Sequence, residues 1–233
     1  MNPAEMKHLN FVLFFLLISF GALGVAAQEA KYPPSSEYLM PQDAEIALAK
    51  SAAPDNISGR ATVKVLTASG FQVVHDGDNG FVCMVMRGSA GPTFTPAQLR
   101  NLVYDAKLRA PICFNPQASE TVMPYYELRN KLAMESKTPD EITQAIQAAH
   151  SKGELPKRDG VSFAYMWSAD QILGSFGHWH PHMMVFCPYY ENSMLGSNNL
   201  GATPLPIVSD DAGTPFAVVL IPVDDKLAIK AQP

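Results

Sequence analysis

Strand-like patterns at both ends of this chain and helix-like patterns between them predict an α+β fold. Residues 61–87 alternate β-branched and polar side chains between turn residues, and residues 161–223 return to strand-like runs. Residues 96–152 carry helix-start signals and apolar stripes instead. We therefore expect an antiparallel sheet, built from an N-terminal three-stranded meander and C-terminal strands, with a helical segment between them. No repeat or linker interrupts residues 41–233, which are expected to form one domain.

The N-terminal meander is expected to contain strands over residues 61–67, 71–75 and 81–86. Ala68-Ser69-Gly70 and Asp78-Asn79-Gly80 separate them, and Asn-Gly supplies the positive φ values that a tight hairpin turn requires. The third strand is apolar on both of its faces. We therefore expect other elements to cover it on both sides.

Helices are expected before and after the meander. The pattern over 43–53 predicts a short helix that Pro54 ends. Within 96–152, Asn115-Pro116 is an N-cap followed by proline at the first helical position, and Pro124 is expected to kink or split the helix behind it. Thr138-Pro139-Asp140-Glu141 is a capping box that predicts a further helix ending near Gly153.

The C-terminal strands are expected over residues 161–167, 178–186 and 216–223. A segment rich in glycine, proline and asparagine, residues 191–214, separates the last two strands. Such a composition predicts a long loop.

The first 27 residues have the three parts of a secretory signal peptide. Lys7 supplies the positive start, residues 11–25 form an apolar run, and Val25 and Ala27 offer small side chains for signal peptidase. The alternative is a membrane anchor, but the run is shorter than the roughly 20 residues that span a bilayer. We expect cleavage and export to the periplasm or the medium.

The mature chain is expected to begin at Gln28, with residues 28–40 as a flexible leader. Its net charge is −5, and it contains no basic block and no second apolar run long enough to cross a membrane. Nucleic acid is therefore an unsuitable partner, because binding its backbone requires clustered Lys and Arg. A small ligand or another protein of the cell envelope fits this composition better.

Three cysteines remain in the mature chain: Cys83, Cys113 and Cys187. In an oxidising compartment two of them would pair, and we favour Cys83 with Cys113, because Cys187 lies beside the histidines discussed next. The alternative is three buried thiols. Cys187 is also considered as a thiolate nucleophile, a role that requires a lowered pKa and access to substrate.

The most pointed chemical feature is the alternation of His178, His180 and His182. In a strand their side chains would point to one side, with the Cα atoms of neighbours about 6.5–7 Å apart. Three neutral imidazoles form a catalytic zinc site and also suit copper. A zinc bound in this way lowers the pKa of its water to about 7. We therefore expect a zinc or copper site, with metal-dependent hydrolysis as a hypothesis.

Two features favour another interpretation of these histidines. Pro181 cannot donate to a sheet ladder, so the alternation is expected to break there. Three consecutive ligands from one strand also rarely complete a tetrahedron, so a further ligand is required. The candidates elsewhere in the chain are His75, Asp170, Glu191 and Cys187. The alternative is a set of half-buried histidines, with Trp179 packing on the far face.

The His-x-His strand of lysostaphin-type and D-Ala-D-Ala peptidases is similar to His178–His182. Those families add an upstream histidine and aspartate at a set spacing. Neither His75 with Asp76 nor His150 with Asp159 reproduces that spacing. The resemblance therefore stops at this short segment.

A second resemblance covers most of the mature chain. Asp43-Ala-Glu-Ile-Ala-Leu-Ala, Asn79-Gly-Phe-Val-Cys, Ala110-Pro-Ile-Cys-Phe and Gly177-His-Trp-His-Pro-His together resemble a group of uncharacterised exported bacterial proteins. The resemblance implies a bacterial origin and one intact domain. It implies no activity, cofactor or catalytic residue.

Two functions are thus expected. The first is an exported protein that binds a transition metal through His178, His180 and His182, with His75 as a further ligand. The second is a non-catalytic envelope domain that binds a small ligand or a protein partner. In that case residues 191–214 would form the contact surface together with three aromatic residues: Trp179, Tyr189 and Tyr190.

Overall fold

A computed structural model describes residues 33–88, 94, 105–173, 177–178, 180–196, 206–209 and 211–232. The described strands form one eight-stranded sheet in the order β2-β1-β3-β4-β5-β6-β8-β7. The strands are β1 (Thr62–Thr67), β2 (Gly70–His75), β3 (Val82–Gly88), β4 (Asp105–Phe114), β5 (Ser162–Met166), β6 (His182–Phe186), β7 (Ile207–Val208) and β8 (Val218–Pro222). Most neighbouring strands are antiparallel.

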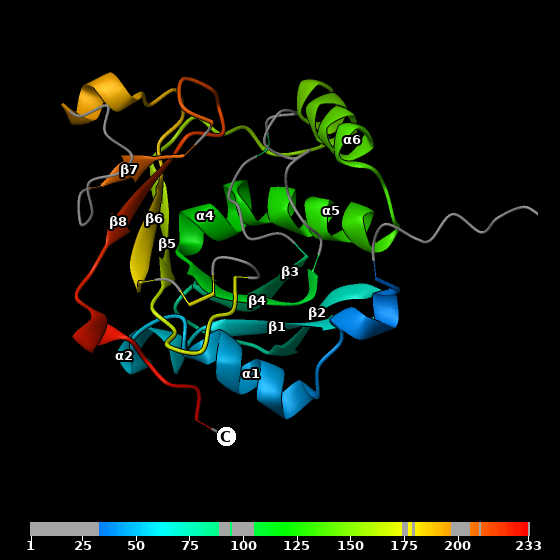
Figure 1. Ribbon diagram of the computed structural model, residues 1–233, viewed down its shortest axis with the longest axis vertical. Helices are drawn as coiled ribbons and strands as arrows, with labels where there is room; N and C mark the ends of the chain where they lie inside the picture. Colours follow the sequence, from blue (N-terminus) through cyan, green and yellow to red (C-terminus); the bar gives the residue numbers. More distant parts are fainter. Residues whose placement is uncertain are drawn as a thin grey trace, which may run out of the picture.

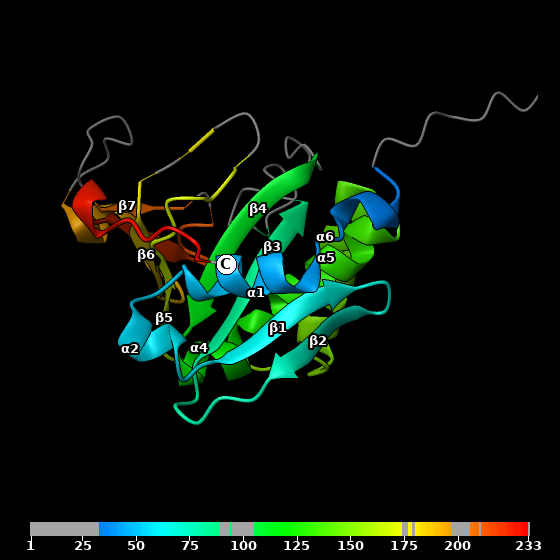
Figure 2. The same ribbon diagram turned by 90° about the horizontal axis from the view of Figure 1, so that it is seen from below.

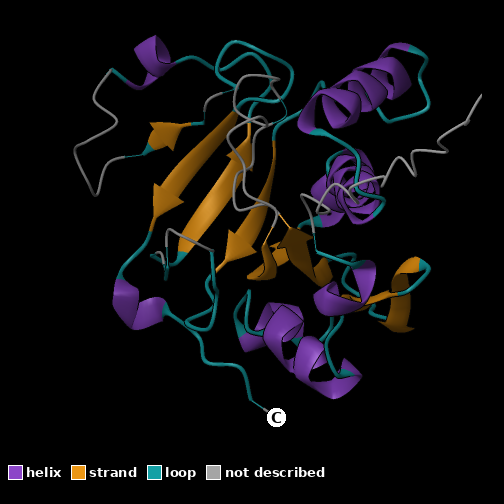
Figure 3. Ribbon diagram, turned by 45° about the vertical axis from the view of Figure 1, so that its right-hand side comes forward, coloured by secondary structure: helices purple, strands orange, loops and turns teal. Residues whose placement is uncertain are grey.

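The described helices are η1 (Ser35–Tyr38), α1 (Gln42–Lys50), α2 (Asp55–Ser58), α4 (Pro116–Thr121), α5 (Met123–Met134), α6 (Pro139–Ser151), η3 (Asn192–Leu195) and η4 (Asp225–Leu227). The longer helices lie on both faces of the N-terminal half of the sheet, while η3 and η4 lie beside its C-terminal strands (Figures 1 and 2). α1 packs on β1, β3 and β4 from one side, while α4 and α5 cover the other side and α6 packs on α5. α4 also contacts β5, and β6 and β8 continue the sheet beyond it (Figure 3). The predicted α+β class is confirmed.

The N-terminal strands differ from a meander in one connection. β1 and β2 form the expected hairpin, with Ala68 and Ser69 at its turn. β3 then pairs with β1 in parallel, not with β2. The segment between β2 and β3 folds back on the start of β1, where the Asp78 amide donates to the carbonyl of Arg60 at 3.0 Å. As a result, β2 is left at the edge of the sheet.

β4 corrects the prediction that residues 96–152 are helical throughout. Residues 105–114 form a ten-residue strand between β3 and β5. Its first buried apolar residues recur at every second position, at Ala106, Leu108 and Ala110, and from Pro111 to Phe114 the strand is buried on both faces. That period is the period of a strand, and Pro111 would disrupt a helix interior. Residues 96–104 lie outside the described part of the chain.

The other predicted helices are confirmed. The Asn115 side chain caps α4 by accepting from the Ala118 amide at 3.0 Å. α5 begins at Met123, so Pro124 lies in its first turn and separates it from α4. The capping box of α6 is complete, because Thr138 and Glu141 each accept from the backbone amide of the other. Among the residues that the structure describes, no helix has the length and apolar character needed to span a membrane.

The predicted disulfide is confirmed. Cys83 of β3 and Cys113 of β4 are opposite each other in the ladder and are joined, with their Cα atoms 3.9 Å apart. Both residues are fully buried in an apolar cluster beneath α1 that also contains Leu48, Val63 and Val85. The bridge therefore links the two central strands inside the smaller of two large cores.

A buried ion pair attaches α1 to the sheet. Glu45 of α1 and Arg87 of β3 are 0% and 1% exposed, and their side chains are 2.7 Å apart. Glu45 also accepts from the Leu66 amide of β1 at 2.9 Å. Burial raises the pKa of Glu45 while Arg87 lowers it, and burial lowers the pKa of Arg87 to about 10. We take this pair as ionised, because each group compensates the charge of the other.

Stacking against aromatic rings fixes α5 on the opposite face. The guanidinium of Arg129 is fully buried and lies 5.1 Å from the ring centre of Phe94 and 4.8 Å from that of Tyr126. Arg158, from the segment after α6, approaches the rings of Phe186 and Phe216 in the same core. Such cation–π contacts are stabilising when the cation is removed from water. They hold α5 in one orientation and thereby fix the position of the next residue, Asn130.

Candidate functional site

The three alternating histidines occupy different environments. β6 begins at His182, directly after Pro181, so the strand does not extend back to His178 and His180. His178 and His180 are exposed, whereas His182 is 3% exposed. The side chains therefore do not share one face, and the break falls at the proline that cannot donate to the ladder.

Each of the last two histidines has a local hydrogen-bond partner. Nδ1 of His182 donates to the carbonyl of His180 at 2.8 Å, and burial lowers the pKa of His182 to about 4. Nδ1 of His180 lies 2.7 Å from a carboxylate oxygen of Asp225, which belongs to the short helix η4. His182 is therefore a neutral, packed residue at neutral pH, and His180 is held at the surface.

The other expected ligands lie elsewhere. His75 is exposed at the end of β2, and β1, β3, β4 and β5 lie between β2 and β6. Asp170 accepts from the Ala231 amide at 2.7 Å, and Glu191 accepts from Ser193. Within the described residues, no three His, Cys, Asp or Glu side chains form a group that would hold a metal ion.

Cys187 does not have the environment of a nucleophile. It is a half-buried free thiol that packs, as Val185 does, against the cluster of Val208, Ala217 and Val219, and burial raises its pKa. A raised pKa reduces the thiolate fraction, which is the reactive form. Of the aromatic residues expected at a contact surface, Tyr189 is 61% exposed and Tyr190 packs in the same cluster as Cys187, while Trp179 and residues 197–205 and 210 lie outside the described part.

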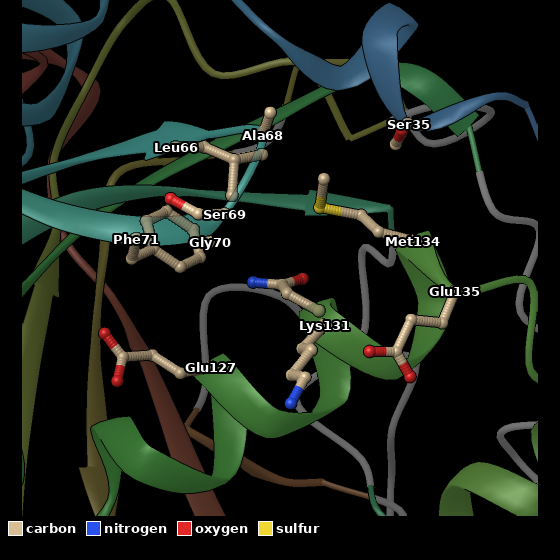
Figure 4. Close-up of a pocket in the computed structure, with 11 residues that line it drawn as sticks. Ser35, Leu66, Ala68, Ser69, Gly70, Phe71, Glu127, Lys131, Met134 and Glu135 are labelled. Atoms are coloured by element: carbon tan, nitrogen blue, oxygen red, sulfur yellow. The ribbon is translucent and has the colours of Figure 1, made fainter.

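A groove near the other end of the sheet has the form of a binding site. It lies between α5 and the β1–β2 hairpin, with a volume of about 500 Å³ (Figure 4). Its lining residues are Ser35, Leu66, Ala68, Ser69, Gly70, Phe71, Glu127, Asn130, Lys131, Met134 and Glu135. A volume of this size is in the range of sites that accept small ligands.

The two walls of the groove differ in character. The hairpin wall is mainly apolar, with Leu66 and Phe71 facing α5, and the Met134 side chain of α5 points back toward Leu66 and Ala68 (Figure 4). The α5 wall carries charge, with Glu127, Lys131 and Glu135 spaced four residues apart. Glu127 forms an ion pair with Lys64 of β1, which fixes the distance between helix and hairpin.

Asn130 is the distinctive residue of this groove. It is 2% exposed, and neither its amide nitrogen nor its carbonyl oxygen has a hydrogen-bond partner among the described residues. Most buried side-chain polar atoms in folded proteins have a partner, so each exception requires an explanation. Leaving such a group unpaired costs about 1–3 kcal/mol.

Sequence reasoning did not single out Asn130, although one signal for its burial exists. Tyr126, Asn130 and Ala133 lie at i, i+4 and i+7 of α5, and all three are buried. The helical period thus places one amide on the apolar side of the helix. The hairpin wall arrives from residues more than fifty positions earlier, so no local pattern reveals the groove itself.

Comparison with known proteins adds no function to this geometry. No protein-family model, no curated protein and no solved structure matches the chain.

Proposed function

We propose that this protein is a non-catalytic binding domain and that the groove between α5 and the β1–β2 hairpin holds a small polar ligand. The observation that carries the proposal is the buried Asn130 carboxamide, which lines a cavity and lacks a partner among the described residues. A ligand that supplies the missing acceptor and donor would recover the free energy that the free protein loses there.

The fixed position of the two walls of the groove supports the same proposal. Arg129 fixes the turn of α5 that carries Asn130, and Glu45 fixes Leu66 in the opposite wall. Both anchors are buried. A site whose walls are held by buried contacts is organised before its ligand arrives, which lowers the entropic cost of binding.

The test is an NMR titration of the labelled protein with a library of small polar fragments that includes N-acetylglycinamide, glucose and glutamine. We expect a subset of fragments to shift the side-chain NH2 signals of Asn130 and the backbone amides of Gly70 and Phe71. Asn130→Leu should abolish these shifts, whereas Thr143→Val, which removes a buried hydroxyl without a described partner on α6, should leave them unchanged. The proposal fails when millimolar fragments shift no groove signal.

We also propose that the protein is exported. The apolar run ahead of Val25 and Ala27 supports this, as does the Cys83–Cys113 bridge, because stable disulfides form mainly outside the cytoplasm. Intact-mass measurement of the exported material should give a chain that begins at Gln28. Exported protein that retains Met1 would contradict this proposal.

Surface metal binding at His178 and His180 is a second candidate function. The observation that favours it is the contact between Nδ1 of His180 and Asp225, because a carboxylate on one ring nitrogen commonly orients a histidine that binds metal through the other. Zinc and copper are the ions that suit imidazole. Elemental analysis of protein equilibrated with either ion at pH 7.5 tests it, and protein without stoichiometric metal rejects it.

A further inference from the structure

We infer that the ligand of the groove is an extended peptide segment, which pairs the N–H and C=O of one residue with Asn130 and continues along the outer edge of β2. This inference rests on the proposed binding function and names the class of ligand. It follows from the hydrogen-bonding capacity of the groove, from its apolar wall and from the position of β2 in the sheet.

The Asn130 carboxamide restricts the chemistry of the ligand. Its nitrogen donates and its oxygen accepts, and both atoms lack a partner among the described residues. A sulfate would only accept, and an ammonium group would only donate, so each would leave one of the two atoms unpaired. One residue of an extended peptide directs its N–H and its C=O to the same side and satisfies both.

The hairpin wall favours a peptide over a sugar. Leu66, which is 4% exposed, Phe71 and Met134 belong to one apolar cluster around Tyr38. A sugar would place several hydroxyl groups against these apolar atoms, where each unpaired hydroxyl is costly. A peptide alternates its amides with side chains, so one amide can reach Asn130 while an apolar side chain lies against the hairpin.

The edge of the sheet lies next to the groove. β2 is the first strand in the sheet order and pairs only with β1 among the described strands. Phe71, its second residue, lines the groove, and Val73 further along is 50% exposed. An edge strand presents unpaired N–H and C=O groups that an added strand can complete. A peptide anchored at Asn130 would thus find further backbone partners on β2.

A strand added to the edge of β2 would direct alternate side chains to the two faces of the sheet. Its apolar side chains would lie on the α5 side, against Leu66 and Phe71, which line the groove. Its charged side chains would point to water on the opposite face. The groove therefore fits a peptide in which apolar and charged residues alternate.

The probes that test this inference are capped hexapeptides in which valine alternates with lysine or glutamate, together with the same peptides methylated at every backbone nitrogen. N-methylation removes the donors and leaves the side chains in place. We expect the unmodified peptides to shift the backbone amides from Gly70 to Val73 and the NH2 signals of Asn130. Asn130→Leu should weaken binding about tenfold or more, since two buried hydrogen bonds are lost.

The controls separate this inference from the binding function. Thr143→Val should bind the peptides like the wild type, and the N-methylated peptides should not bind. If small fragments occupy the groove but the hexapeptides do not, or if the N-methylated peptides bind equally well, the peptide inference is overturned and the binding function stands. If neither class of probe shifts the groove signals, both are overturned.

Discussion

The histidine segment before β6 and the groove beside α5 lie on opposite halves of the same sheet. They differ in whether a buried polar side chain has a hydrogen-bond partner. His182 is buried, and its Nδ1 donates to a carbonyl two residues away. Asn130 is buried to the same extent, and its amide has no partner among the described residues. The first region contains the histidines that the sequence suggests as metal ligands. The second contains a side chain whose hydrogen bonds the described residues do not supply.

This difference shows how a buried polar side chain with a structural role can be distinguished from one with a role in binding. A group that is satisfied by its own chain stabilises the fold, and its removal should be costly. A group that is left unsatisfied next to a cavity lowers stability, and its removal should be harmless to the fold but not to binding. Substitutions at both kinds of position therefore test the comparison.

The largest effect is expected at Glu45, the satisfied acid that holds Leu66 in the groove wall. Glu45→Ala leaves the buried Arg87 without its counter-ion and the Leu66 amide without its acceptor. We expect a loss of about 3–5 kcal/mol in the free energy of unfolding, measured in urea. Asp78→Ala, which removes the partner of the exposed Arg60, is the matched control and should change little. Equal effects of the two substitutions would show that burial of the Glu45–Arg87 pair has no consequence.

The next effect concerns His182 and pH. Burial lowers the pKa of His182 to about 4, whereas an unfolded chain titrates near 6.5. Between these values the unfolded state binds more protons, so the stability from this residue is complete above pH 6.5 and is lost as the pH falls toward 4. We expect the contribution of His182 to the free energy of unfolding to fall by about 3 kcal/mol between pH 6.5 and pH 4.

Urea unfolding of the wild type and of His182→Leu between pH 4 and 7, with EDTA present, measures this contribution. The difference in unfolding free energy between the two proteins should change with pH by the amount just given. A difference that stays constant would mean that His182 is not a buried neutral histidine and would break the contrast with Asn130.

The smallest effect on stability is expected at His180, which lies at the surface. His180→Ala should leave the urea midpoint almost unchanged, because exposed pairs such as His180 with Asp225 contribute little. If the protein takes up zinc or copper, this variant should lose the metal. His75→Ala and His182→Leu should keep it, since His75 lies five strands along the sheet and His182 is buried. Loss of metal in His75→Ala would contradict the strand order.

Local patterns in the sequence predicted much of this fold. The hairpin at Ala68 and Ser69, the cap at Asn115, the capping box at Thr138 and the Cys83–Cys113 bridge are all present. Each of these features depends on residues close in sequence or, for the disulfide, on a choice among three cysteines.

The missed features depend on contacts between distant segments. β3 pairs with β1 because the segment around Asp78 returns to Arg60, and no turn motif encodes that return. The groove joins α5 to the β1–β2 hairpin, and the partnerless amide of Asn130 exists only in that context. The alternation of the histidines in the sequence does not place them on one face, because β6 begins only at His182, after Pro181.

The measurement that tests the central claim most directly is the free energy of unfolding of Asn130→Leu in urea, without any ligand. If the amide is unsatisfied in the free protein, leucine fills nearly the same volume without a buried polar group. We therefore predict that the variant is as stable as the wild type or more stable, by about 1 kcal/mol. A loss of about 2 kcal/mol or more would show that Asn130 is hydrogen-bonded within the fold, and the account of the groove as a binding site would be contradicted.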